Sequence, residues 1–281
     1  MSIPTPASNL LRTDSPSSAS ETGKKTQMIE ILNAEEFELM KSSGKILQEV
    51  FRTLDKEIRP GMSTYDVDKI VHDIITGHGA VPSFLNYGEP PFSGSACTSV
   101  NEAVVHGIPS KKRILKDGDI ISVDVGAILE GYHSDACRTY LVGDVKQEVK
   151  DLVTRTKQSF FEGLKYAYAG NRTGDIGHAV QEYCESFGYG VVRELTGHGI
   201  GTSLHQDPEV LNYGKAGHGC KLKVGMAICI EPMITLGKRY IEQLNDGWTI
   251  VTRDGLPAAH YENTILITEE GPVMTTYEED V

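Results

Sequence analysis

The sequence predicts an α+β domain in which antiparallel sheets are covered by helices, and an internal repeat is the main reason for this prediction. Two blocks of sequence each occur twice, at a spacing of about 107 to 109 residues. One block has the pattern of a helix start, and the other has the pattern of a strand that follows a glycine turn. We therefore expect one domain over residues 34–281, made of two pseudo-symmetric halves at 34–149 and 150–281. The alternative is a chance likeness of two helix starts and two strands.

The helical part of the repeat is expected to form two helices in each half. The first helix of each half is predicted near residues 35–55 and 150–169. The second is predicted from a glycine, a threonine that can cap a helix, an aspartate in the first turn and apolar residues at helical spacing. These features occur at Gly61, Thr64 and Asp66, and again at Gly170, Thr173 and Asp175.

The strand part of the repeat predicts a hairpin over residues 119–142, with its turn at Glu130 and Gly131. A two-residue turn there places Asp124 opposite Cys137 and Asp135 opposite Gly126. Asp124 and Asp135 then become diagonal neighbours on one face, with Cβ atoms at most roughly 7 to 8 Å apart. Two carboxylates this close repel each other unless they are protonated or share a cation. For this pair alone, a solvated sheet face remains the simpler alternative.

Two more carboxylates lie where a strand should be apolar. Glu231 occupies the position equivalent to Asp124 in the second half and lies within a run of apolar residues, and Glu262 interrupts the strand-like stretch 260–268. A carboxylate in such a run is costly unless it is paired or bound to a metal. His198 lies between glycines that would allow a sharp turn and bring its imidazole close to a ligand.

Together these residues form an oxygen-rich set of four carboxylates and one imidazole, which suits two close divalent ions of Mn, Co, Fe or Zn. A dinuclear site holds a bridging water, lowers its pKa and polarises a scissile carbonyl, so the expected reaction is hydrolysis. His106 and His205 lie in loop contexts and could donate hydrogen bonds to the reacting group. The other six histidines are interpreted as surface or packing residues. The sequence contains neither GxSxG nor the P-loop pattern.

Composition limits the class of protein. The chain has 281 residues and a formal net charge of −12, which argues against a surface that binds nucleic acid. It lacks the ~20 consecutive apolar residues of a membrane-spanning helix. The five cysteines are odd in number and never spaced as CxxC, so we expect a reducing compartment, the cytoplasm, with an organelle as the alternative. Residues 1–33, rich in serine and proline at their start, are expected to form a disordered tail.

Five short motifs resemble the type 1 methionine aminopeptidases, over about residues 34–277. They are Val123-Asp124-Val125, Tyr132-His133-Ser134-Asp135, Gly197-His198-Gly199-Ile200-Gly201, Ile230-Glu231-Pro232-Met233 and Tyr261-Glu262-Asn263-Thr264. The resemblance implies the "pita-bread" fold, which has the same pseudo-two-fold symmetry as the repeat. It implies a bacterial-type metallopeptidase that removes the initiator methionine, with Asp124, Asp135, His198, Glu231 and Glu262 as the ligands of two metal ions.

The resemblance also implies roles around the metals. Glu231 would take part in proton transfer, while His106 and His205 would contact the substrate and stabilise the tetrahedral intermediate. An apolar pocket would select methionine, and the matching positions are Tyr87, Phe92, Cys97, Leu204 and Trp248. The expected partner is a peptide or nascent chain that begins with methionine. We expect a monomer, and the ribosome is a candidate partner.

Two other functions use the same sequence features. The first is a proline-directed relative, an aminopeptidase P or prolidase, which uses the same metal set but usually has a large additional N-terminal domain. The second is a binding protein that keeps the fold but has lost its metal-ligating residues. The presence of suitable residues at all five ligand positions argues against it.

Overall fold

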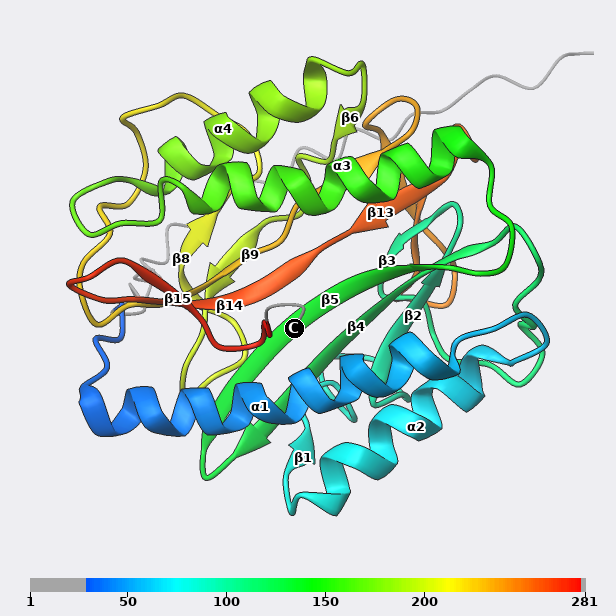
Figure 1. Ribbon diagram of the computed structural model, residues 1–281, viewed down its shortest axis with the longest axis horizontal. Helices are drawn as coiled ribbons and strands as arrows, with labels where there is room; N and C mark the ends of the chain where they lie inside the picture. The colour runs from blue at the N-terminus through cyan, green and yellow to red at the C-terminus, as the bar shows by residue number, and fades with distance from the viewer. Residues whose placement is uncertain (1–28, 279–281) are drawn as a thin grey trace, which may run out of the picture.

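The computed structural model describes residues 29–278 and is built around one nine-stranded sheet (Figure 1). The hydrogen-bonded order along this sheet is β1-β4-β5-β14-β9-β7-β8, while β2 also pairs with β4 and β15 with β14. The bounds are β1 (Val81–Pro82), β2 (Ala96–Val100), β4 (Ile120–Leu129), β5 (Tyr132–Leu141), β7 (Gly197–Gly199), β8 (Gln206–Val210), β9 (Ala227–Ile230), β14 (Glu262–Ile267) and β15 (Pro272–Met274).

Two small sheets and four helices complete the described part of the chain. One small sheet has the order β13-β10-β6 and the other β11-β12-β3. Their bounds are β3 (Ala103–Val105), β6 (Gly190–Val191), β10 (Met233–Thr235), β11 (Ile241–Gln243), β12 (Ile250–Thr252) and β13 (Ala258–His260). The helices are α1 (Ala34–Glu57), α2 (Thr64–Gly77), α3 (Gln147–Leu164) and α4 (Thr173–Glu185). The predicted α+β architecture with antiparallel sheets is confirmed.

The repeat in the sequence is visible as a repeat in the structure. Figure 1 shows α1 and α2 across the lower half of the large sheet and α3 and α4 across its upper half. The pair β4–β5 belongs to the first half and the pair β9–β14 to the second. Strands β5 and β14 pair antiparallel at the centre, where Cys137 lies opposite Glu262. The strands that carry the predicted carboxylates of both halves are therefore neighbours.

The predicted hairpin register is confirmed. Asp124 lies opposite Cys137 and Asp135 opposite Gly126. Glu130 and Gly131 both have positive φ, at 50° and 88°. This is the backbone of a type I′ turn, whose twist matches that of the flanking strands.

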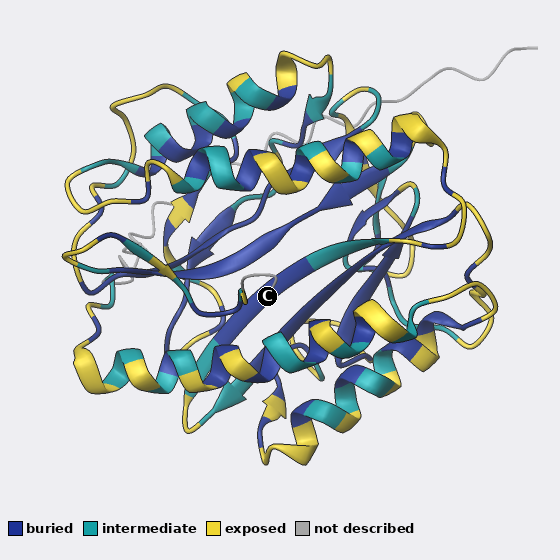
Figure 2. Ribbon diagram, in the orientation of Figure 1, coloured by how far each residue is buried: buried dark blue, intermediate teal, exposed yellow. Residues whose placement is uncertain are grey.

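Alternation along β4 separates the core from the site. Ile121, Val123 and Val125 pack with residues of α1 and α2 in one apolar cluster. Because successive side chains of a strand point to opposite faces, Asp124 points away from these helices. Figure 2 shows the central strands buried while the helices expose one side to solvent.

The helix starts differ from the prediction in one detail. Thr64 and Thr173 do not cap their helices but are the first helical residues. Ser63 caps α2, and its side chain and that of Asp66 each accept a backbone N–H of the other residue. Thr64 instead exchanges hydrogen bonds with the backbone of Ser110, which ties the helix to a distant loop.

The predicted tail lies mostly outside the described residues. Its last part, residues 29–33, is placed: Leu32 is buried and donates its backbone N–H to the carbonyl of Gly225. Asn33 caps α1. Within residues 29–278, no helix combines the length and the apolar character needed to cross a membrane.

We predict that Thr264→Val destabilises the protein by about 1–3 kcal/mol, because it leaves a buried backbone donor and acceptor unpaired. The Thr264 hydroxyl donates to the carbonyl of Asp135 and accepts its N–H, at 2.8 and 2.9 Å, next to the short β5–β14 ladder. Urea denaturation would measure the change. Thr76→Val, on the exposed face of α2, is the matched control and should change stability by less than ~0.5 kcal/mol. An equal effect of both variants would contradict the prediction.

Candidate metal centre

The five predicted ligands come from five strands or strand ends of the large sheet. Asp124 lies on β4, Asp135 on β5 and His198 at the middle of β7. Glu231 follows the last residue of β9, and Glu262 begins β14. All five residues are buried, with exposed fractions of 9% or less.

Their ligand atoms lie close together. Asp124, Asp135 and Glu262 form one group whose ligand atoms are all within 4.8 Å of one another. Glu262 also belongs to a group with Glu231 and His260, and to one with His198 and Cys229. The Nε2 of His198 lies 3.5 Å from Glu231 Oε1 and 3.9 Å from Asp135 Oδ2. Glu262 is thus common to all three groups.

Burial and mutual repulsion change the ionisation of this cluster. Burial raises the pKa of Asp124 to about 6. Burial, then the charges of Glu262 and Asp124, raise the pKa of Asp135 well above its usual value. Burial also raises the pKa of Glu231 and Glu262 strongly, with added repulsion from Asp124 and from Glu231 respectively. The cause in every case is the cost of negative charge in a low-dielectric space.

The donor set fits divalent cations. Asp124 Oδ1, Asp135 Oδ1 and Glu262 Oε1 are buried without a hydrogen-bond partner among the described residues. Burial lowers the pKa of His198 to about 3, so its imidazole is neutral at pH 7. Its Nδ1 lies 2.9 Å from the carbonyl of Gly199 and donates to it, which leaves the Nε2 lone pair free. Unpaired carboxylate oxygens and a free imidazole nitrogen are the ligands that Mn, Fe, Co and Zn accept.

The glycines around His198 act differently from the prediction. They do not form a sharp turn, because Gly197 and Gly199 belong to β7 and pair with β8 and β9. A Cβ on Gly197 would lie 2.4 Å from the carbonyl oxygen of Cys229, and one on Gly199 would lie 2.2 Å from that of Asp207. Glycine is therefore required for close approach of neighbouring backbones, and this packing holds His198 at the cluster.

A cavity of about 340 Å³ opens onto the cluster. Four of the five residues predicted for the methionine pocket line it: Tyr87, Phe92, Cys97 and Trp248. The rings of Phe92 and Trp248 meet edge to face, with centroids 5.3 Å apart. Leu204 departs from the prediction, because it is buried in the apolar cluster that contains Phe92 and Cys97 and is absent from the cavity lining.

His106 and His205 both line this cavity. His106 has a φ of 58°, a left-handed backbone that is uncommon outside glycine, and its ring meets Trp248 edge to face. Burial lowers its pKa to about 4, so it is neutral at pH 7. The Nδ1 of His205 lies 2.6 Å from the hydroxyl of Tyr87, and its ring centroid is 4.4 Å from that of His198.

The sequence interpretation missed two residues next to the cluster. The sequence indicates a surface or packing role for His260, but this residue lines the same cavity and is only 2% exposed. Its signal in the sequence was its separation of two residues from Glu262, which places two side chains of an extended segment on one face. Arg138 has no such signal in the sequence. It donates to the carbonyl of Glu262, at 2.6 Å, and to the side chain of Asn263.

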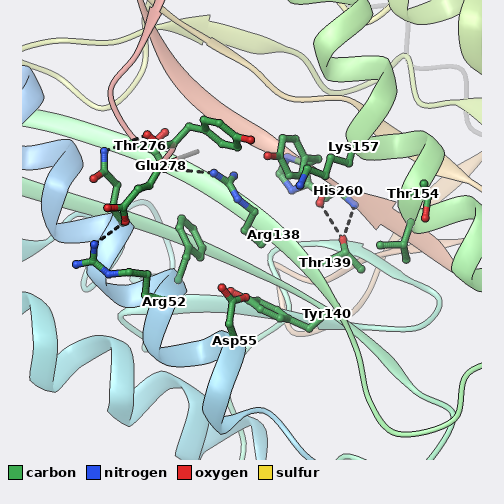
Figure 3. Close-up of a pocket in the computed structure, with 15 residues that line it drawn as sticks. Arg52, Asp55, Arg138, Thr139, Tyr140, Thr154, Lys157, His260, Thr276 and Glu278 are labelled. Carbon is green, nitrogen blue, oxygen red and sulfur yellow. Dashed lines mark hydrogen bonds and ion pairs between the residues drawn. The ribbon is translucent and has the colours of Figure 1, made fainter. Parts of the chain in front are cut away.

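Arg138 reaches these groups from the helix side of the sheet. Figure 3 shows it in a second cavity, of about 700 Å³, which is lined by residues of α1 and α3. The guanidinium also lies over the rings of Phe51 and Tyr261, at 4.7 and 4.4 Å from their centroids. Arg138 therefore holds the backbone of Glu262 from behind the metal cluster.

We predict that metal-free protein loses stability between pH 4 and 7, relative to its Asp124→Asn variant. The folded-state pKa of Asp124 is raised from 3.8 to about 6, so the native state holds more protons than the unfolded state in this range. The Asp124 contribution is therefore favourable below pH 4 and is lost as the pH rises through 6, by up to about 3 kcal/mol. The comparison at each pH reduces the opposite effect of the buried histidines, which are present in both proteins.

Urea denaturation in the presence of a chelator would measure this difference. Added Mn²⁺ should restore stability at pH 7 in the wild type, because a bound cation replaces the missing protons. A pH profile that is the same in both proteins would contradict the raised pKa.

Comparisons with known proteins agree with this geometry. Residues 38–269 match the model of metallopeptidase family M24. A methionine aminopeptidase from Clostridium acetobutylicum is 51% identical over 249 residues, which cover 89% of this chain and 99% of the relative. Methionine aminopeptidase 1 of Bacillus subtilis is 48% identical, over 84% of this chain and 94% of its own.

Solved structures give the same result. The structure of a methionine aminopeptidase from Thermotoga maritima superposes with a TM-score of 0.87 at 43% identity, covering 89% of this chain and all of the other. A prolidase from Pyrococcus furiosus has a TM-score of 0.72 at 24% identity, and only 66% of its chain is covered, so this likeness concerns the fold alone. The chain therefore belongs to the methionine aminopeptidases of metallopeptidase family M24, of the bacterial type with the pita-bread fold.

Proposed function

We propose that Asp124, Asp135, His198, Glu231 and Glu262 hold two divalent metal ions, with which the protein removes methionine from the N-terminus of peptides and nascent proteins. The observation that carries this proposal is the group of buried, unpartnered carboxylate oxygens within 4.8 Å at one end of an apolar cavity. When bound, the ions supply Lewis acidity and a water of lowered pKa. Mn, Co, Fe and Zn all suit the set.

Glu231 is proposed to move the proton. It follows the last residue of β9 and lines the cavity. A carboxylate beside the attacking water can accept its proton and return it to the leaving amine. Its place at the boundary of cluster and cavity puts it within reach of both.

His106 and His205 are proposed to hold the scissile peptide. A neutral imidazole presents one N–H donor and one acceptor. A neutral His106 donates to the oxygen that becomes negative without adding a full charge to the cavity, and such donors contribute most where charge develops. The Nδ1 of His205 and the Tyr87 hydroxyl share a hydrogen bond of 2.6 Å, which orients the imidazole ring at the cavity.

The cavity wall suits a methionine side chain. Phe92 and Trp248 form part of the cavity wall with their edge-to-face rings, and Cys97 adds a small apolar surface to this wall. Sulfur of a thioether makes favourable contacts with aromatic rings. The wall is apolar and aromatic, with no charged side chain beyond the cluster at its end. The free N-terminal amine of the substrate would then lie toward the carboxylates.

The free cysteines bear on the compartment in which the enzyme acts. All five cysteines are free, as a reducing compartment requires, and we infer the cytoplasm. We further propose that the protein acts as a monomer on chains leaving the ribosome. Light scattering at micromolar concentration would test the monomer, since a second copy would double the mass.

We predict that the purified protein with added Mn²⁺ or Co²⁺ cleaves Met-Ala-Ser but neither Leu-Ala-Ser nor Ala-Pro. The apolar cavity accommodates methionine, while nothing in it provides for the rigid imide of an X-Pro bond. Release of the first amino acid, measured by amine derivatisation, would test this. Turnover of Ala-Pro equal to that of Met-Ala-Ser would favour a proline-directed enzyme, and no turnover with any metal would favour a binding protein.

We predict that His106→Ala lowers kcat by ~10²-fold or more, as expected for loss of a donor to a developing oxyanion. Steady-state kinetics on Met-Ala-Ser would separate kcat from KM. His72→Gln is the control, since His72 contacts Ser95 outside the cavity. A change confined to KM would assign His106 to substrate binding alone.

A further inference from the structure

His260 is a buried polar side chain that lies next to the carboxylate cluster. It ends β13, is 2% exposed, and neither ring nitrogen makes a hydrogen bond within the described residues. Burying a polar group without a partner costs free energy, and native structures rarely accept this without a reason. The surroundings of the ring indicate the reason.

Its Nε2 faces two of the proposed metal ligands. It lies 3.6 Å from Oε2 of Glu231 and 3.9 Å from Oε2 of Glu262, and these three residues form one of the groups within 4.8 Å. His198 relates to the cluster in almost the same way, with its Nε2 at 3.5 Å from Glu231 Oε1 and 3.9 Å from Asp135 Oδ2. Each carboxylate oxygen of Glu231 thus has its own imidazole nitrogen.

These distances are too long for hydrogen bonds, which join N and O at about 2.7–3.2 Å. They are close to the spacing of two ligands on one cation. With bonds of ~2.0–2.2 Å to nitrogen and oxygen, two ligand atoms of one ion lie about 3 to 3.6 Å apart. A small adjustment of side chains on a bound ion would close the remaining gap.

We propose that His260 is a metal ligand through Nε2 and shares an ion with Glu231 and Glu262. The proposal rests on the proposed function, because it adds a sixth residue to the five that hold the metals. Each oxygen of Glu231 then has an imidazole nitrogen beside it: His198 at Oε1 and His260 at Oε2.

The backbone around His260 is held for this role. The Thr139 hydroxyl accepts the N–H of His260 at 3.0 Å and donates to its carbonyl at 2.8 Å (Figure 3). On the other side, β13 pairs His260 with Met233, two residues after Glu231. The two residues are thus fixed relative to each other. A second imidazole makes the centre softer, which shifts its preference from Mn²⁺ toward Co²⁺ and Zn²⁺.

Proton NMR of the Co²⁺-loaded protein in H₂O and D₂O would test the proposal. A coordinated imidazole shows its remaining N–H as a strongly shifted, solvent-exchangeable signal. We expect two such signals in the wild type and one in both His260→Gln and His260→Ala. The Co²⁺ dissociation constant, measured by competition with a chelating dye, should rise by ~10-fold or more. The matched control is His72→Gln, which should keep both signals and the affinity.

Several outcomes would overturn the proposal. One signal in the wild type would exclude a second imidazole without need of any variant. Both signals retained in His260→Gln, with unchanged affinity, would exclude His260 itself. Asp135→Asn separates this proposal from the proposed function: if it binds Co²⁺ like the wild type, the five-residue centre is wrong, whatever His260 does.

Discussion

Four carboxylates share one buried space in this protein, and their mutual repulsion is the constraint on which the site depends. Asp124 and Glu231 come from equivalent positions of the two halves, and Asp135 and Glu262 from the neighbouring strands β5 and β14. Burial prevents water from screening their charges, so each pKa is raised. The fold holds them in place through the β5–β14 pairing, the Thr264 hydroxyl and Arg138. A site strained in this way binds cations because cations remove the strain.

The two-fold symmetry of the fold does not extend to the residues that line the substrate cavity. Both halves supply carboxylates in similar ways. Both halves line the cavity, but with unlike residues: Tyr87, Phe92 and Cys97 lie on β2 and the loop before it, while Leu195, Met233 and Trp248 come from the second half. His198 has no imidazole counterpart at the equivalent place in the first half. Duplication therefore explains why both halves contribute carboxylates to the cluster, while the loops that differ between the halves line the cavity.

Neutral histidines around the cluster link metal binding to chemistry. Burial lowers the pKa of His106, His198 and His260 to about 4, 3 and 4, so none adds positive charge at neutral pH. Positive imidazolium groups would neutralise the carboxylates and compete with metal ions. Neutral rings do neither, and an unprotonated imidazole nitrogen remains open to a cation or to the substrate. The same burial raises the pKa of the carboxylates, so a bound cation would take the place of their protons.

The sequence by itself determined the repeat, the hairpin register and the carboxylates. A two-residue turn at Glu130 and Gly131 sets which residues oppose each other, and strand alternation then places Asp124 and Asp135 on one face. These are local rules, so they can be applied without knowing the fold. The tertiary structure decided what distant segments do to one another. It brought His260 to Glu231 across β13 and β10, placed Arg138 behind Glu262, and put Leu204 in the core instead of the cavity wall. It also decided that the glycines around His198 allow neighbouring strands to pack closely and do not form a turn. Such contacts depend on how the sheet and loops pack, and apart from the separation of two residues between His260 and Glu262, no spacing along the chain indicates them.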